Sequence, residues 1–301
     1  MLGGAFFRPS AATTPLEPPT SAITVAPPVY EANTRPDLIG RIIVPVMVNG
    51  RGPFQFLLDT GANRTVLTPR LVAELGLHSS RDEAVTLSGV TGAQVVPTVW
   101  VDRVSAGALV LENQRLPVAY ALGNDVEGIL GVDGCANKRV LVDFVHHKVE
   151  IRSSRSVVTL AGVRQARTRF KFGLLMIAPG HIGGVRANAV IDTGSEYTLG
   201  NTALHDALHL HEQENRSDLT EVIGQTLTQQ FGARHLVRNL EVADTRTQLV
   251  NVVFGEFYMF KLWDLDKEPT LVLGMDLMGG LDTLVIDYGR HEIQFRPRKL
   301  Y

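Results

Sequence analysis

Two Asp-Thr-Gly tripeptides stand in matching contexts, each directly after a run rich in apolar residues. The first begins at Asp59, after Phe54–Leu58, and the second begins at Asp192, after Ala187–Ile191. Two carboxyl groups held close together cannot both ionise cheaply, so they share one proton. The charged member of such a pair can activate a water molecule, and the neutral member can donate a hydrogen bond to a carbonyl oxygen. A single copy is equally well explained as a turn, but the matching pair favours one shared catalytic site.

The similarity between the two halves extends beyond the tripeptides. Gly128–Asp133 recurs as Leu271–Asp276, and the hairpin that begins at Leu141 recurs at Val285. Three motifs that recur in the same order predict one ancestral unit that was duplicated and fused. The two Asp-Thr-Gly tripeptides are 133 residues apart, whereas the later motifs are further apart, so the second half carries an insertion between its motifs.

The residues before each aspartate follow the pattern of short β-strands. Arg41–Val48 is rich in branched side chains, Asn49-Gly50 is typical of a hairpin turn, and Phe54–Leu58 returns as the strand that ends at Asp59. A short helix is predicted after Thr68, which can cap it, with Pro69 in its first turn. In the second half the strands begin near Thr168, and a helix is predicted near 199–210. We therefore expect an all-β fold with short helices.

The length and net charge limit the possible number of domains and the possible partners of the chain. A chain of 301 residues fits two domains. We expect a proline-rich leader over 1–38, a first lobe over 39–152, a linker over 153–167 and a second lobe over 168–301. The net charge of −2 gives no electrostatic sign of nucleic-acid binding. The basic residues between Arg164 and Lys171 are interpreted as a solvated linker.

The N-terminal segment leaves two interpretations open. Residues 1–12 resemble the end of a signal peptide, which predicts a periplasmic or secreted protein, but a disordered leader of a cytoplasmic protein fits as well. The seven prolines between 8 and 38 predict an extended tether. No run of 18 apolar residues is present, so we expect no integral membrane span.

With both motifs in place, the chain resembles the retropepsin-like aspartic proteases of the bacterial kind, with two such units in one polypeptide. The resemblance covers about 39–298. It implies two retropepsin- or pepsin-like β-barrel lobes around a central active-site cleft, and an aspartic endopeptidase that acts on extended protein or peptide segments. Asp59 and Asp192 would be the catalytic pair. One chain would suffice for the active site, with no metal and no other cofactor.

The resemblance also implies roles for residues around the pair. Thr60 and Thr193 would hydrogen-bond across the lobe interface. The two loops and the segments that run beside them would contain Gly61, Ala62, Gly194, Ser195, Gly131 and Gly274. A flap would cover the substrate with Ser88, Gly89, Val90, Thr91 and Gly92, and a second, longer flap is expected near 224–232. Neither flap carries the tyrosine of pepsin-like enzymes, and Glu196 stands where a small residue is usual.

One asymmetry between the loops supports a hypothesis about charge. Ala62 follows the first tripeptide, whereas Ser195 follows the second. A serine hydroxyl that donates to its carboxylate would favour the charged form. We therefore expect Asp192 to be the ionised member of the pair and Asp59 the protonated one.

Other candidate residues have simpler explanations. Cys135 has no evident base partner and is interpreted as a small buried filler. His205 and His209, with His211 nearby, have the spacing of zinc ligands on a helix but lack the catalytic glutamate of that motif. His147 and His291 recur in the hairpin turns of both halves, which indicates a structural role. Two alternatives to a protease remain open, namely a peptide-binding module without turnover and a latent enzyme masked by its leader or second flap.

Overall fold

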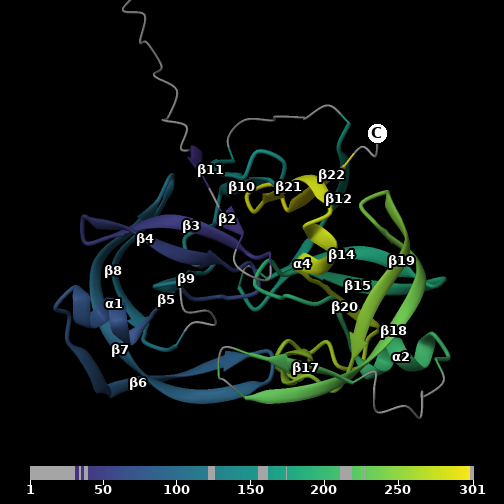
Figure 1. The fold of residues 1–301 in the computed structure, drawn as a ribbon, viewed down its shortest axis with the longest axis horizontal. Coiled ribbons are helices and arrows are strands. Elements are labelled where there is room, and N and C mark those ends of the chain that lie inside the picture. The colour runs from purple at the N-terminus through teal and green to yellow at the C-terminus, as the bar shows by residue number, and fades with distance from the viewer. Residues whose placement is uncertain are drawn as a thin grey trace, which may run out of the picture.

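The computed structural model describes residues 31–33, 35–36, 40–120, 126–154, 162–173, 175–210, 219–224, 226 and 228–298. Strands dominate, with four short helices among these residues. Two lobes of curled sheet lie side by side, and a third sheet lies across their common side (Figure 1). The expected all-β architecture of two lobes with short helices is confirmed.

The first lobe is built on one curled sheet. Its strand order is β5 (Val66–Leu67), β9 (Gly128–Leu130), β4 (Arg51–Leu58), β3 (Ile42–Val48), β7 (Gly92–Ala106) and β6 (Ser79–Gly89), with β2 (Arg35–Pro36) beside β3 and β8 (Leu109–Pro117) beside β7. Helix α1 (Pro69–Glu74) begins where Thr68 accepts a hydrogen bond from the Leu71 N–H. Strand β4 ends directly before Asp59 and pairs in parallel with β9.

The second lobe repeats this plan. Its sheet has the order β13 (Arg169–Lys171), β14 (Leu175–Ile182), β15 (Val185–Ile191), β20 (Thr270–Leu273), β16 (Leu199–Gly200), β19 (Thr245–Phe254), β18 (Gln229–Val242) and β17 (Leu219–Ile223). Its helices are α2 (Thr202–Ala207), α3 (Tyr258–Leu262) and α4 (Met275–Met278). Strand β15 ends directly before Asp192 and pairs in parallel with β20, as β4 does with β9.

A sheet of six strands joins the lobes. Its order is β1 (Glu31–Asn33), β11 (Lys148–Ser153), β10 (Lys138–Asp143), β21 (Leu281–Asp287), β22 (Glu292–Pro297) and β12 (Arg164–Arg167). At its centre β10 of the first half pairs with β21 of the second, with Arg139 opposite Asp287. These two side chains form a buried ion pair at 2.9 Å. The pairing ties the closing hairpins of the two repeats together and fixes the position of one lobe against the other.

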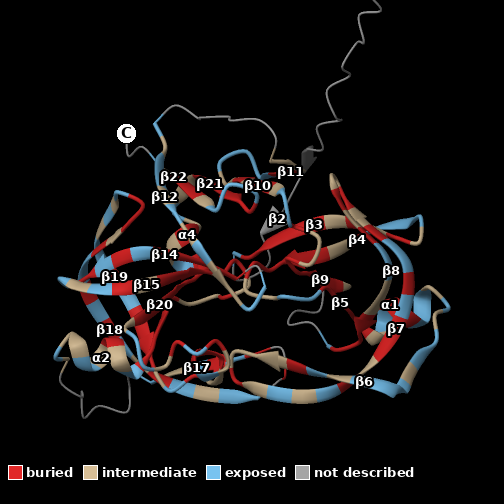
Figure 2. Ribbon diagram, turned by 180° about the vertical axis from the view of Figure 1, so that it is seen from behind, coloured by how far each residue is buried: buried red, intermediate tan, exposed pale blue. Residues whose placement is uncertain are grey.

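Burial follows the strands that converge on the middle of the molecule. The strands that lead to the two aspartates are buried at the ends that reach the aspartates, whereas the outer faces of the peripheral hairpins are exposed (Figure 2). Phe56, Leu58 and Ile191 are at most 2% exposed. Apolar packing on both sides of these strands holds the following loops in place.

Three expectations about boundaries differ from the structure. Residues 31–33 and 35–36 of the predicted leader form β1 and β2, because their backbone groups pair with β11 and β3 despite the nearby proline. Residues 164–167 of the predicted linker form β12, which pairs with β22. The helix expected at 199–210 is the shorter α2, because Leu199 and Gly200 pair with β19 and β20 and Asn201 then caps the helix. The segment 1–30, on which the export prediction rests, lies outside the described residues.

Within the described ranges, none of the helices has the length and apolar character needed to cross a membrane.

Candidate active site

The two Asp-Thr-Gly loops meet between the lobes. Each loop leaves the end of a buried strand, so the backbone on either side cannot shift without disturbing the core. Asp59 is 5% exposed and Asp192 is 4% exposed. Their carboxyl groups are hydrogen-bonded to each other. Two acids that are 133 residues apart in the chain therefore form one buried group.

The glycine of each loop lies against the carboxyl group of the other loop. A Cβ atom added at Gly61 would stand 2.5 Å from Asp192 Oδ2, and one added at Gly194 would stand 2.3 Å from Asp59 Cγ. Real Cβ atoms do not approach other atoms this closely. The absence of a side chain at these two positions is therefore what allows the carboxyl groups to come together.

Thr60 and Thr193 hold the two loops together through hydrogen bonds. The Thr60 N–H donates to Thr193 Oγ1 at 3.2 Å, and the Thr193 N–H donates to Thr60 Oγ1 at 3.0 Å. Each hydroxyl then donates to a carbonyl of the opposite strand, Thr60 to Ile191 at 2.8 Å and Thr193 to Leu58 at 2.7 Å. All four bonds cross the lobe boundary and are buried, so the two loops form one unit.

A threonine–aspartate pair supports each loop in the same way. In the first lobe Thr65 Oγ1 donates to Asp133 at 2.6 Å and accepts the Gly131 N–H at 3.2 Å. In the second lobe the corresponding bonds join Thr198 to Asp276 at 2.7 Å and Gly274 to Thr198 at 3.2 Å. These pairs attach each aspartate loop to the segment beside it.

The threonine–aspartate pairs were not among the predicted site residues. Their signal was present in the sequence, because Asp133 and Asp276 both end the second repeated motif and Thr65 and Thr198 both lie six residues after the aspartate of their loop. Gly131 and Gly274 do run beside the loops as the resemblance implied. A Cβ at Gly274 would stand 2.3 Å from the Tyr197 carbonyl oxygen, so only glycine fits there.

Burial sets the charge state of the pair. Burial raises the pKa of Asp59, while the hydrogen bond from Asp192, the N–H groups of Gly61 and Ala62 and the charge of Arg41 all oppose this rise. Burial also raises the pKa of Asp192, and there the charge of Asp59 adds to the effect. The N–H groups of Gly194 and Ser195 oppose this rise, but the pKa still lies well above its usual value. The environment therefore favours a charged Asp59 and a protonated Asp192.

This assignment reverses the hypothesis based on Ser195. The Ser195 hydroxyl donates to the backbone carbonyl of Tyr197 at 2.8 Å and not to the Asp192 carboxylate. The expected stabilisation of a charged Asp192 by this hydroxyl is therefore wrong. The buried Arg41, which is 4% exposed, instead favours the charge on Asp59. The position of Arg41 in the repeat corresponds to Leu174 in the second half, so this cation has no counterpart there.

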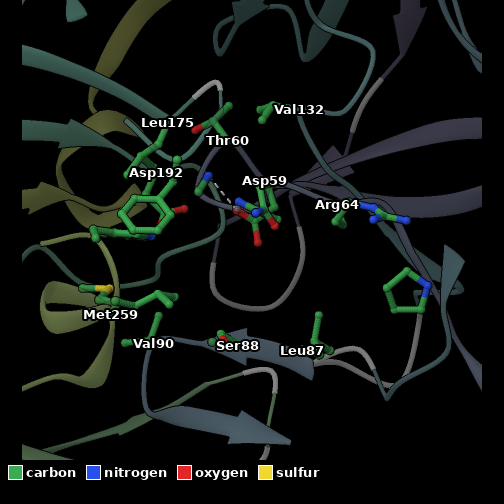
Figure 3. A pocket seen from close by; sticks show the side chains of 18 of the residues that line it. Asp59, Thr60, Arg64, Leu87, Ser88, Val90, Val132, Leu175, Asp192 and Met259 are labelled. Carbon is green, nitrogen blue, oxygen red and sulfur yellow. Dashed lines mark hydrogen bonds between the residues drawn. The ribbon is translucent and has the colours of Figure 1, made fainter. Parts of the chain in front are cut away.

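A cavity of about 320 Å³ opens above the pair. One wall is the hairpin of β6 and β7, which contributes Leu87, Ser88 and Val90 opposite the aspartates (Figure 3). This hairpin is the predicted flap, with Val90 and Thr91 at its tip between the two strands. The remaining walls come from both lobes, so a bound molecule would contact residues of both repeats.

The second hairpin, of β17 and β18, reaches the tip of the first. The Gly224 N–H donates to Thr91 Oγ1 at 3.1 Å, and Thr91 is 5% exposed. A Cβ at Gly92 would contact Thr228 Oγ1 at 3.4 Å. The predicted second flap at 224–232 thus divides into a tip at 224–228 and strand residues from Gln229 onward, and residues 225 and 227 lie outside the described part.

The remaining candidates lie away from the pair or have structural partners. Cys135 is 2% exposed, and burial raises its pKa to about 12. His205 packs its ring against His235 and Phe254, with ring centroids 5.3 and 5.4 Å apart. Among the residues that the structure describes, no group of His, Cys, Asp or Glu is arranged to hold a metal ion, and His211 lies outside them.

The recurring histidines occupy equivalent hairpin turns. His147 and His291 both have a left-handed backbone conformation, with φ of 53° and 55°. They lie between β10 and β11 and between β21 and β22, so they belong to the same turn of the two repeats.

Comparisons with known proteins agree with this geometry. The crystal structure of an aspartic proteinase from Irpex lacteus matches with a TM-score of 0.57, covering 90% of this chain and 98% of that one at 12% sequence identity, which shows a shared fold. No curated protein sequence matches the chain. The family model described as aspartyl protease matches residues 44–133 and 178–277, one Asp-Thr-Gly loop in each stretch. Since the matched stretches make up more than half of the sequence, the chain belongs to the aspartyl protease family.

Proposed function

We propose that the protein is an aspartic endopeptidase that hydrolyses peptide bonds with Asp59 and Asp192. The observation that carries the proposal is the buried, hydrogen-bonded carboxyl pair at the floor of a cavity that both lobes line. A lone structural aspartate needs neither the opposing glycine nor the cavity. Membership of the aspartyl protease family supports the same reaction.

The proposed mechanism uses the unequal surroundings of the two acids. Asp59, whose charge is favoured by the hydrogen bond from Asp192 and by Arg41, takes a proton from a water molecule held between the carboxyl groups. Asp192, whose pKa is raised further, keeps its proton and donates a hydrogen bond to the carbonyl oxygen of the substrate as negative charge develops there. The water oxygen forms a bond to the carbonyl carbon, and the C–N bond breaks as the proton taken by Asp59 passes to the leaving nitrogen.

The substrate would be an extended polypeptide segment. Strand β6 and the tip of its hairpin with β7 line the cavity opposite the aspartates, so backbone groups there can pair with a bound chain while the cavity receives its side chains. Because both aspartates belong to one chain, the site needs no second copy. No cofactor enters the proposed reaction.

The test compares cleavage with binding. The wild type, Asp59→Asn and Asp192→Asn are incubated with a library of unstructured peptides between pH 3 and pH 7, and the products are identified by mass spectrometry. We expect cleavage by the wild type and a loss of about 100-fold or more in each variant. Asp102→Asn, which changes an exposed aspartate of β7, serves as the matched control and should retain the wild-type rate.

Two outcomes would contradict the proposal. Peptides that bind to the wild type without any turnover would support a non-catalytic binding module. Cleavage that persists in either dyad variant would show that the reaction does not depend on the pair. A wild type that cleaves only after residues 1–30 are removed would instead identify a latent form of the same enzyme.

A further inference from the structure

A second concave surface lies where β12 of the six-stranded sheet meets the sheet of the second lobe. It has a volume of about 580 Å³, and its lining comes from the β12–β13 connection, from β14 and β15, and from the residues just before β20. Among the described residues, none lines both this surface and the active-site cavity. We call it the arginine groove, because Arg167, Arg169 and Arg186 all line it.

The arginine groove carries an excess of positive charge. Arg167 ends β12, Arg169 begins β13 and Arg186 lies on β15, so the fold brings together cations from three strands. Glu268 is the one acidic residue among the described residues of the lining, so three arginines against one glutamate leave two positive charges unbalanced. The chain as a whole has a net charge of −2, so the basic character is a local property of this surface.

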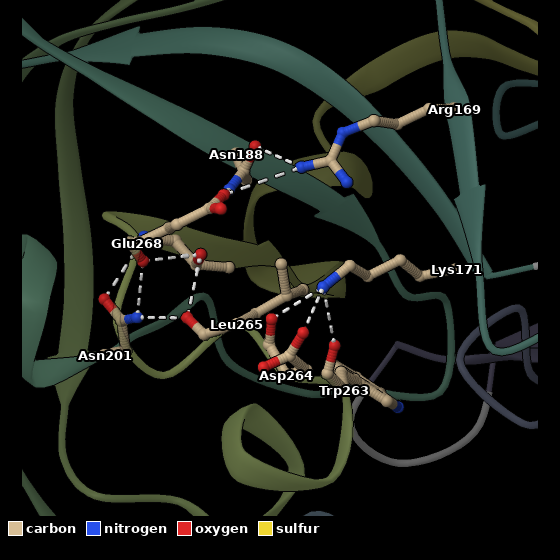
Figure 4. A network of polar contacts seen from close by, with 9 residues as sticks. Arg169, Lys171, Asn188, Asn201, Trp263, Asp264, Leu265 and Glu268 are labelled. Atoms are coloured by element: carbon tan, nitrogen blue, oxygen red, sulfur yellow. Dashed lines mark hydrogen bonds and ion pairs between the residues drawn. The ribbon is translucent and has the colours of Figure 1, made fainter.

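Arg169 already has an acidic neighbour. Its Nη2 donates to Asn188 Oδ1 at 2.8 Å and lies 3.8 Å from Glu268 Oε2, and Asn188 Nδ2 donates to the same glutamate oxygen at 2.8 Å (Figure 4). The side chains of Arg169 and Glu268 are 49% and 62% exposed, so water screens the pair and it contributes little to stability. A carboxylate of a bound molecule can therefore compete with Glu268 for Arg169.

Arg167 and Arg186 are exposed and have no such neighbour. Within the described ranges, neither guanidinium group forms an ion pair with a carboxylate. Glu292 lies opposite Arg167 in the ladder between β12 and β22, but its carboxylate accepts a hydrogen bond from Gln294 Nε2 at 2.7 Å instead. Two guanidinium groups are thus available to an anion, and each presents a planar set of donors that matches a carboxylate.

Thr168 lies between two of the arginines and has an unsatisfied hydroxyl. Its N–H donates to the His291 carbonyl at 2.9 Å, but its Oγ1 is buried and has no hydrogen-bond partner among the described residues. A buried hydroxyl without a partner costs free energy. Because Thr168 also lines the groove, a carboxylate bound there would offer the missing acceptor.

The strand that begins with Arg169 leads towards the active-site cavity. Lys171, at the other end of β13, donates to the Trp263 and Asp264 carbonyls at 3.3 and 2.6 Å, which holds this end of the strand in place (Figure 4). Phe172, the next residue, lines the active-site cavity. Arg169 and Phe172 are three residues apart, and three residues span at most about 10 Å. A polypeptide that leaves the cavity beside Phe172 therefore needs only a few more residues to reach the arginine groove.

We propose that the arginine groove binds an acidic segment of the polypeptide substrate, away from the bond that is cleaved. This inference rests on the proposed peptidase function, because it names the bound segment as part of the substrate. Part of the basic stretch at 164–171, interpreted from the sequence as a solvated linker, then serves in substrate binding. The carboxylate of Glu268 among the arginines disfavours a dense polyanion such as a nucleic acid, whereas spaced carboxylates can avoid it.

The first experiment measures binding without turnover. The full-length Asp192→Asn protein is titrated into a dye-labelled peptide in which glutamate alternates with serine, and binding is followed by fluorescence anisotropy at low salt. In the same background, the double variant Arg167→Met, Arg186→Met should bind the peptide about tenfold more weakly, because two charge-assisted contacts are lost. Added salt should weaken the binding of the parent protein more than that of the double variant.

A variant of opposite sign and a control complete this experiment. Glu268→Gln should bind the peptide about threefold more tightly, because it removes the competing charge while its side chain can still accept from Asn188. The double variant Arg51→Met, Arg81→Met is the matched control, since it removes two exposed arginines of β4 and β6 in the first lobe. It should bind the peptide as the parent protein does.

The second experiment measures cleavage. A peptide that the wild type cleaves is resynthesised with the acidic segment joined to either end, and with a serine segment of equal length as the reference. We expect the acidic segment at one end to raise kcat/KM by about tenfold, mainly through a lower KM, because it adds binding that is equal in the ground and transition states. In Arg167→Met, Arg186→Met the ratio of kcat/KM between the acidic and the serine peptide should fall close to one.

Three outcomes separate the possibilities. Equal binding of the acidic peptide by the parent protein and by Arg167→Met, Arg186→Met, or weaker binding by Glu268→Gln, would overturn the inference. A single-stranded oligonucleotide of equal charge that binds more tightly than the peptide, through the same two arginines, would overturn the choice of an acidic polypeptide. Arginine-dependent binding together with a wild type that cleaves no peptide would contradict the proposed function, and the bound segment would then not be a substrate.

Discussion

Thr60 and Thr193 each donate a backbone N–H to the hydroxyl of the other, at 3.2 and 3.0 Å, across the boundary between the two repeats. The arrangement is nearly symmetric, as expected for loops that descend from one duplicated unit. Because both side chains are buried, water cannot replace these bonds. The separation of Asp59 from Asp192 therefore depends on two residues that do not themselves react.

Removing the Thr193 hydroxyl should destabilise the contact between the two Asp-Thr-Gly loops. Thr193→Val keeps the shape of the side chain but leaves the Leu58 carbonyl and the Thr60 N–H without their partner. We expect a loss of about 1–3 kcal/mol in the free energy of unfolding, measured by urea denaturation, together with a lower kcat. Thr202→Val, a change in the exposed first residue of α2, should have little effect on either quantity. Equal stability of Thr193→Val and wild type would contradict the inferred role.

The raised pKa of Asp192 predicts a dependence of stability on pH. The native state holds its proton more tightly than the unfolded chain, whose aspartates titrate near 3.8. The stabilisation is therefore complete below this pH and is lost as the pH rises through the higher native pKa. Asp192→Asn removes the titration, so the variant should lose less stability than the wild type between pH 4 and pH 7. Parallel unfolding curves against pH for both proteins would contradict the assignment.

Arg41 should influence the acid limb of the plot of kcat/KM against pH. Its charge favours the ionised form of Asp59, so Arg41→Met should raise the pKa of that carboxyl and move the rising limb of kcat/KM to higher pH. Arg41→Lys keeps a cation and should leave the limb closer to the wild-type position. The measurement is kcat/KM for one peptide between pH 2 and pH 7. A limb at the same pH in the Met variant would show that another group sets the charge of Asp59.

Cys135 should be unreactive in the native protein. Its thiol is buried, and both burial and the nearby Asp133 carboxylate raise its pKa to about 12, so the reactive thiolate is scarce at neutral pH. We expect iodoacetamide at pH 8 to leave the folded protein unmodified and to alkylate it fully in urea, as measured by intact mass. Rapid alkylation of the folded protein without loss of activity would contradict this placement.

The sequence predicts the centre of the site better than its periphery. The paired motifs around Asp59 and Asp192 are local signals repeated twice, and the duplication itself predicts two similar lobes. Met259 of α3 and Trp263 line the cavity together with a flap that is distant in the chain, and no local sequence pattern predicts this arrangement. The strand at Arg35–Pro36 arises because β3 offers a partner. The Ser195 hydroxyl donates to the Tyr197 carbonyl, which the folded loop brings within 2.8 Å of it.

We propose that Asp59 and Asp192 act as one unit that holds a single proton. The most direct test is kcat/KM against pH for the wild type and for Asp59→Asn and Asp192→Asn, with the same peptide and with folding checked by circular dichroism. We expect a bell-shaped profile for the wild type, which rises as the first carboxyl ionises and falls as the shared proton is lost, and almost no activity in either variant at any pH. A wild-type profile with one limb only, or a variant that retains activity, would contradict it.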